Sequence, residues 1–79
     1  MTTTTTTYRK ILLIDGQYRG GMYTYSQDAA SPEIARELTT IGSAHTLATG
    51  ERYAIQRVER RLGGDGDWHI TETSIIELL

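Results

Sequence analysis

The stretch RYAIQRVERRLGGDGDWHIT, residues 52–71, decides the fold of this chain. An arginine-rich segment, Arg52–Leu62, runs into the glycine-rich sequence Gly63–Asp67, and an aromatic, β-prone segment, Trp68–Thr73, follows. A Gly/Asp cluster between two segments that can pair is typical of a β-hairpin. These residues therefore predict two antiparallel strands in the last third of the chain.

The arginine-rich segment also has a helical interpretation. Ile55, Val58 and Leu62 recur at i, i+3 and i+7, which is the spacing of one helix face. We favour a strand because the segment leads directly into the turn, although such a strand needs a bulge or twist near Gln56-Arg57. A helix over Glu51–Leu62 is the alternative, and it would give a two-helix αβ fold.

The N-terminal third predicts another hairpin. Tyr8–Ile14 is a short apolar strand that stops at Asp15-Gly16, the sequence most typical of a two-residue type I′ turn. Gln17–Ser26 is the expected return strand, and Gly20-Gly21 in its middle predicts a bulge or a close backbone approach. A two-residue loop sets these residues opposite each other: Leu13 and Tyr18, Ile11 and Gly20, Arg9 and Met22, and Tyr8 and Tyr23.

A single helix is predicted between the two hairpins. Ser31 is a favourable N-cap, Pro32 suits the first helical position, and Gly42 is a suitable residue after the helix end. One apolar stripe is formed by Ile34, Ala35, Leu38 and Ile41. The predicted fold class is therefore α+β, a small ββαββ domain with an antiparallel sheet and one helix packed on one face.

The two ends of the chain carry separate expectations. Residues 1–7 are threonine-rich and are expected to form a flexible tail, although threonine is β-prone and the tract could instead extend the first strand. Residues 8–79 are expected to form a single αβ domain. A chain of 79 residues has a small core. A homodimer is therefore expected, with these C-terminal residues packing on the core or on a second subunit: Ile75, Ile76, Leu78 and Leu79.

Composition narrows the class of protein. Eight basic and ten acidic residues give a net charge of −2, which argues against a non-specific nucleic-acid binder. The chain contains no cysteine, so neither disulfides nor a thiolate nucleophile is available. No apolar run approaches the ~20 residues of a transmembrane helix. We therefore expect a cytoplasmic protein with no membrane partner.

The residues with catalytic or metal-binding chemistry do not form a recognisable motif. His45 and His69 are the only histidines, without further ligands at zinc spacing, and Ser43 and Ser74 are near them in sequence alone. Gly63–Asp67 lacks the Lys-Ser/Thr ending of a phosphate-binding loop and is too short for an EF-hand, although its carboxylates could hold a weak cation. We predict a non-enzymatic protein with no catalytic residues, no cofactor and no metal.

The candidates for partner binding are arginines and aromatic residues. The cluster Arg52–Arg61 could contact phosphates or an acidic protein surface, or it could be a solvated face neutralised by Glu51 and Glu59. Tyr and Trp must supply the large core groups because phenylalanine is absent, but some can be exposed and used in an interface. The predicted partner-binding residues are Arg19, Tyr23, Arg57, Arg60 and Arg61.

The length, the hairpin Tyr8–Tyr25, the capped helix Ser31–Ile41 and the missing catalytic motif give a resemblance of type. The chain resembles the small single-domain proteins of phages and mobile elements, including anti-CRISPR inhibitors. This resemblance implies a protein-binding module that sterically blocks a larger host protein complex in the host cytoplasm. The alternative is a small nucleic-acid-binding or regulatory protein that uses the Arg52–Arg61 cluster, and a subunit of an enzyme complex is a third hypothesis.

Overall fold

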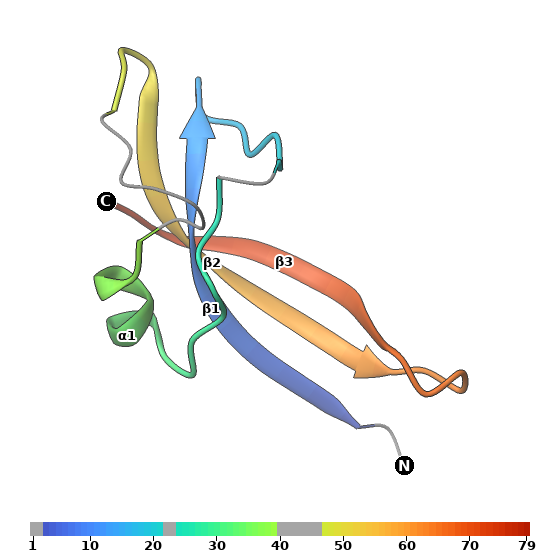
Figure 1. Cartoon of the computed structure of the whole chain (residues 1–79). Coiled ribbons are helices and arrows are strands. Elements are labelled where there is room, and N and C mark those ends of the chain that lie inside the picture. The colour runs from blue at the N-terminus through green and yellow to red at the C-terminus, as the bar shows by residue number, and fades with distance from the viewer. Residues whose placement is uncertain (1–2, 22–23, 40–46) are drawn as a thin grey trace.

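In the part of the chain that the computed structural model describes, three strands and one short helix make up an α+β domain (Figure 1). The structure describes residues 3–21, 24–39 and 47–79. The elements, in chain order, are β1 (Thr4–Ile14), α1 (Pro32–Glu37), β2 (Glu51–Leu62) and β3 (Trp68–Leu78). The antiparallel sheet has the order β1-β2-β3. The expected antiparallel sheet with a helix is confirmed, but the ββαββ order is wrong, because among the described residues one strand precedes the helix and two follow it.

The strand interpretation of residues 52–62 is confirmed, and the alternative of a helix over Glu51–Leu62 is wrong. β2 pairs with β1 from Glu51 to Arg61 and with β3 from Ala54 to Leu62. The irregularity expected near Gln56-Arg57 lies between Ile55 and Gln56, and a second one lies between Glu59 and Arg60. In both places β3 has the extra residue, first Ile76 and then Thr71. As the central strand, β2 forms hydrogen bonds with both of its neighbours, and this pairing favours an extended backbone even though its apolar residues are spaced as in a helix.

Part of the N-terminal threonine tract belongs to the sheet. Thr4–Thr7 form the first residues of β1 and lie opposite Val58–Arg61 of β2. The interpretation of residues 1–7 as a tail is therefore corrected for these four threonines. The tract also accepts a side-chain hydrogen bond from β2: the Arg60 guanidinium donates to Thr7 Oγ1 at 2.9 Å. The long partner strand provides the pairing that a threonine tract cannot provide for itself.

The turn at Asp15-Gly16 forms as expected. Asp15 (φ 51°) and Gly16 (φ 81°) are both in the left-handed region, which a type I′ turn requires. The backbone groups of Ile14 and Gln17 exchange two hydrogen bonds of 2.9 and 3.0 Å. Tyr18 packs against the cluster that contains Leu13, whereas Ile11 bridges Tyr25 and not the predicted Gly20.

The predicted return strand Gln17–Ser26 is wrong. Gly20 (φ 73°) and Gly21 (φ 107°) take left-handed conformations that end the pairing after one bridge. The chain returns to β1 at Tyr25, which bridges Ile11, and at Ala29, which bridges Tyr8. The predicted pairs with Met22 and Tyr23 involve residues outside the described part of the chain. We use the name segment 17–29 for the described residues 17–21 and 24–29, which form no regular strand yet bridge the outer edge of β1 at three points.

Two small clusters pack on opposite faces of the sheet. On one face, Ile55 packs with Ala29 and Ala35, beside Tyr8 and Leu38. We call this the helix face, because Ala35 belongs to α1.

The other face carries Ile11, Leu13 and Ala54, covered by Tyr18 and Tyr25, and we call it the tyrosine face. Arg9 lies on this face, 5.1 Å from the ring centroid of Tyr25 and 5.6 Å from that of Tyr18. Its Nε donates a hydrogen bond of 2.8 Å to the buried Gln56 side chain. Arg9 therefore ties segment 17–29 to β2 through cation–π and polar contacts.

The helix is correctly placed but shorter than predicted. Ser31 is the N-cap and its Oγ accepts a hydrogen bond from the Ile34 backbone N–H. The helix ends at Glu37, because Leu38 is already extended (φ −80°, ψ 152°). Within the predicted stripe Ala35 is buried, whereas Ile34 is half exposed. Ile41 and Gly42 lie outside the described residues.

Candidate functional site

Large apolar side chains lie exposed on the tyrosine face of β2 and β3. Directly opposed residues of antiparallel strands point to the same face. The register therefore places Trp68, Ile70, Ile75 and Leu78 beside Leu62, Arg60, Gln56 and Ala54, respectively. We name the following five residues the apolar ridge: Leu62, Trp68, Ile70, Ile75 and Leu78. Their side chains are 41–53% exposed, so the ridge is a surface feature and not part of either cluster.

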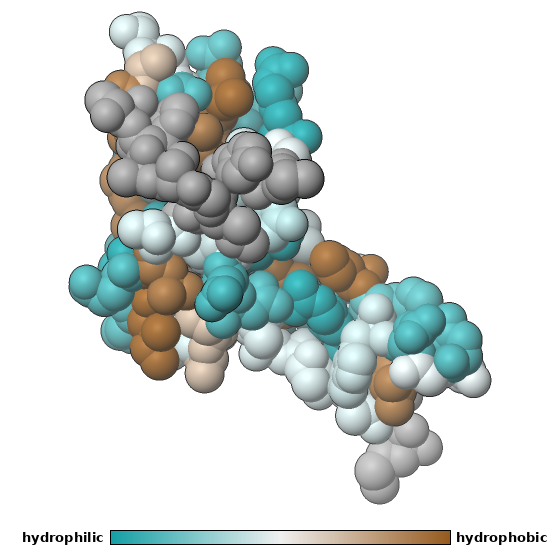
Figure 2. Space-filling model, in the orientation of Figure 1, coloured by the Kyte–Doolittle hydropathy of each residue, from teal (hydrophilic) through white to brown (hydrophobic). Residues whose placement is uncertain are grey.

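The ridge extends onto an arm of the molecule. We define the arm as Thr4–Thr7, Val58–Leu62 and Trp68–Thr73, which project away from α1 and give the domain extents of 45 × 23 × 22 Å (Figure 1). Figure 2 shows hydrophobic side chains over the middle of β3 and near the end of β2, while the tip of the arm is hydrophilic. The apolar surface is therefore aligned along a strand pair.

The backbone beside the ridge has a free edge. β1 and β3 are the outer strands of the sheet, and segment 17–29 bridges the outer edge of β1. Within residues 3–21, 24–39 and 47–79, no segment bridges the outer edge of β3. A long edge strand with exposed apolar side chains is a template for pairing with another chain.

The predicted basic site is divided between the two faces. Arg57 and Arg61 are opposed to Tyr8 and Thr4 and lie on the helix face. Arg60 is opposed to Thr5 and lies on the tyrosine face, as strand alternation predicts.

Two of these arginines are engaged within the chain. Arg57 forms an ion pair with Glu59 at 3.5 Å, and Arg60 forms one with Asp28 at 2.8 Å. Arg61 and Arg19 are exposed, and Arg19 lies in segment 17–29, while Tyr23 is outside the described residues. The structure does not bring the predicted partner-binding residues together, and their role stays a prediction.

The hairpin tip is ordered by its own polar groups. Asp65 Oδ1 accepts a hydrogen bond of 3.0 Å from the Asp67 backbone N–H, and Asp65 Oδ2 lies 2.9 Å from His69 Nε2. These hydrogen bonds, first from Asp67 and then from His69, lower the pKa of the Asp65 carboxyl. Across the described ranges 3–21, 24–39 and 47–79, no group of three or more metal-binding side chains assembles. The contacts of Asp65 and His69 are those of a capped turn.

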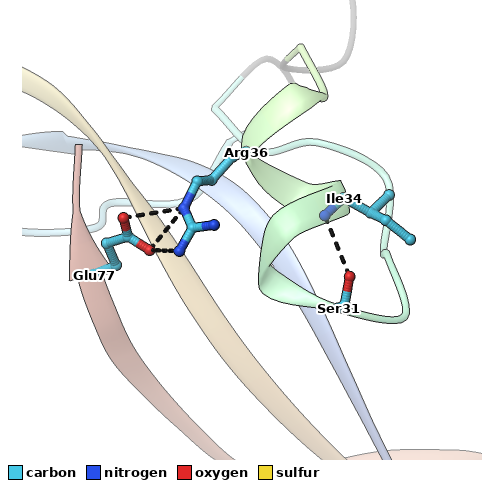
Figure 3. A network of polar contacts seen from close by, with 4 residues as sticks. All are labelled: Ser31, Ile34, Arg36 and Glu77. Carbon is cyan, nitrogen blue, oxygen red and sulfur yellow. Dashed lines mark hydrogen bonds and ion pairs between the residues drawn. The ribbon is translucent and has the colours of Figure 1, made fainter.

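A charged contact links the helix to the edge strand. Arg36 of α1 reaches across to Glu77 of β3, and its Nε donates to both carboxylate oxygens at 3.0 and 2.9 Å (Figure 3). A further hydrogen bond runs from Arg36 Nη2 to the same carboxylate. The hydrogen bonds from Arg36 lower the pKa of the Glu77 carboxyl. This forked contact holds α1 over the helix face, so the apolar ridge on the other face is left open.

Acid is expected to weaken the fold through Glu77. Because the pKa of Glu77 is lower in the folded than in the unfolded chain, its contribution is present above the ordinary carboxyl pKa and is lost as pH falls toward the folded value. Glu77→Gln should therefore reduce the loss of unfolding free energy between about pH 5 and pH 2, as measured by urea unfolding. Glu72→Gln removes a charge from the same strand and should keep that loss. An unchanged acid dependence in Glu77→Gln would assign the effect to other carboxylates.

The residues of the ridge carried a signal in the sequence. Trp68 and Ile70 alternate with polar residues, which marks one apolar face of a strand. The exposure of Ile75 and Leu78 was not readable, because the sequence does not show whether the helix covers their face. Trp68 is among the aromatic candidates, but neither Trp68 nor Leu62 is among the predicted partner-binding residues, and both are exposed in the structure.

Fold and surface together define a small α+β domain with an apolar ridge beside a free strand edge. No family model matches the chain, and no curated protein or solved structure matches it either. In the described part of the chain, α1 is far too short to cross a membrane, and no helix there has the length and apolar character for it.

Proposed function

We propose that this protein is a non-catalytic protein-binding module whose contact surface is the apolar ridge. The observation that carries the proposal is the alignment of five large apolar side chains, each 41–53% exposed, on one face of the β2–β3 pair, with three of them on the projecting arm. Burial of such groups is worth roughly 25 cal/mol per Å². An exposed row of this kind marks an interaction surface.

The partner that fits this surface is a folded protein with an apolar groove. The ridge stands on paired strands whose backbone is already fixed, so little backbone entropy is lost on binding and the entropy cost is that of ordering its side chains. Trp68 supplies an aromatic anchor of the type that dominates interface energies. Arg60, held by Asp28 and Thr7, lies on the same face as a fixed polar neighbour.

Binding of this kind also gives a mode of action. The arm projects from the rest of the domain (Figure 1). When the ridge is bound to a partner, the rest of the domain would therefore cover the partner surface next to the contact. Together with the resemblance to small phage and mobile-element inhibitors, this supports steric blocking of a larger host complex in the cytoplasm.

Nucleic-acid binding is supported less well. Arg57 and Arg60 point to opposite faces and already pair with Glu59 and Asp28. A phosphate track would have to break these pairs. A steep decrease of nucleic-acid affinity with salt would nevertheless support this alternative over the ridge.

A photo-crosslinking amino acid tests the surface directly. Placed at Leu62 in cells that make the protein, it should yield a discrete adduct with a second protein. Leu62 is suited because it belongs to β2 and not to the free edge. The same group at Arg61, exposed on the helix face, is the matched control and should yield none. Adducts from both positions, or from neither, would contradict the proposal.

Two sets of substitutions then compare the faces. Leu62→Glu should weaken binding to the crosslinked partner about 30-fold, or ~2 kcal/mol, because it places a charge in an apolar contact. Charge reversal at both Arg57 and Arg61 should cost under ~1 kcal/mol, because both lie on the helix face. Isothermal titration measures both, and circular dichroism checks the fold. A larger loss of affinity from the arginine reversals than from Leu62→Glu would show that the partner binds the basic cluster and not the ridge.

A further inference from the structure

The free edge of β3 has a residue pattern that is nearly symmetric about Thr73. Each half of β3 contains one extra residue, Thr71 or Ile76, which has no direct partner in β2. With these two left out, positions on either side of Thr73 match in face and mostly in character: Trp68 and Leu78 are apolar, as are Ile70 and Ile75, and His69 corresponds to Glu77. Two copies of such a strand, placed antiparallel with Thr73 facing Thr73, oppose apolar to apolar and imidazole to carboxylate. We propose that a second copy of this chain pairs with the outer edge of β3 in this register.

Charge selects this register over its neighbours. Placing Glu72 at the centre would set two carboxylates directly opposite each other, which is destabilising. Placing Ser74 at the centre would set Glu72 against Glu77, again two carboxylates, and His69 against the apolar Leu79. With Thr73 at the centre, Glu72 meets Ser74 instead.

The charged contacts within each copy would lie next to those of the other copy where the two β3 strands pair. His69 lies 2.9 Å from Asp65 on one side, and Glu77 binds Arg36 on the other. Setting His69 opposite Glu77 of the second copy therefore produces a row in which acidic and basic groups alternate: Asp65, His69, then Glu77 and Arg36 of the second copy. Charge complementarity thus favours a second copy over an unrelated strand.

Symmetry determines what the pair presents. Antiparallel pairing of identical edge strands requires a two-fold axis perpendicular to the sheet, so both copies keep their tyrosine faces on the same side. The two sheets join into one with six strands, and the two apolar ridges lie next to each other. This pairing does not depend on the proposed function, because it needs no other protein.

Sedimentation of the purified protein tests the pairing. The wild-type mass should approach twice 8.8 kDa as concentration rises to about 100 µM. Thr73→Lys sets two ammonium groups against each other at the axis and should weaken association at least about tenfold. Thr5→Lys introduces the same charge on the same face two strands away and should leave it unchanged. A wild-type monomer throughout, or equal association of the Thr73 and Thr5 variants, would overturn the proposal.

A single cysteine tests the register. The chain has no cysteine, so Thr73→Cys introduces the only thiol. Directly opposed residues have Cβ atoms about 4.5–5.5 Å apart, close to disulfide distance, so mild oxidation should link most of the protein as dimers. Thr5→Cys, also exposed on a strand, should stay mainly monomeric under the same conditions. Equal linkage in both variants would show random collision and would refute the register.

Discussion

Ile55→Ala is expected to lower the free energy of unfolding by about 2–5 kcal/mol. Ile55 is fully buried and packs with Ala29 and Ala35 between the sheet and α1. Its buried neighbours in this cluster are alanines, whose short side chains cannot reach into the cavity that the substitution leaves. A domain of 79 residues has a net stability of roughly 4–12 kcal/mol, so this loss is a large fraction of the total and should shift the urea midpoint strongly.

The matched control is Ile34→Ala. Ile34 is 52% exposed on α1, and alanine has the higher helix propensity, so the expected change is within ~0.5 kcal/mol. Urea unfolding of both variants at one fixed protein concentration measures the difference, because association would otherwise shift the apparent stability. Comparable losses in the two variants would contradict the assignment of Ile55 to the core.

Gly50→Ala should be the second most damaging of these changes, costing about 1–3 kcal/mol. Gly50 has φ +86°, a conformation that a residue with a Cβ atom rarely adopts. An alanine Cβ would also lie 2.6 Å from Oδ1 of Asp15, and the Gly50 carbonyl accepts a hydrogen bond from the Asp15 N–H. The substitution therefore disturbs the entry to β2 and the first turn together.

Gly64→Ala is the control for this change. Gly64 lies in the second turn without a positive φ, and nothing lies within 4 Å of its added Cβ, so stability should stay the same or rise slightly. The double variant Asp15→Gly, Gly50→Ala lacks the carboxylate that the alanine Cβ would contact, but it keeps the strain of an alanine at positive φ. Part of the loss should therefore return in a double-mutant cycle. Full additivity of the two substitutions would exclude the contact with Asp15 as a cause.

The sequence by itself determined the local features of this protein. Asp15-Gly16 forms the expected turn, Ser31 caps the helix, and β2 and β3 flank the turn Gly63–Asp67. Each of these depends on interactions among residues that are close in sequence, such as the positive φ of a turn or the hydrogen bond from a cap to the third following residue. Local preferences of this kind can be read without knowledge of the rest of the fold.

Only the tertiary structure decided which strand edges and faces are covered. Thr4–Thr7 join the sheet because β2 is long enough to pair with them, while Gly20-Gly21 turn segment 17–29 away from regular pairing. Arg57 and Arg60 find Glu59 and Asp28, and one of these partners is distant in sequence. The apolar ridge is exposed for the same reason, since α1 packs on the other face through Ala35 and Arg36. Burial depends on contacts between distant segments, and the alternation of apolar and polar residues along a strand does not specify them.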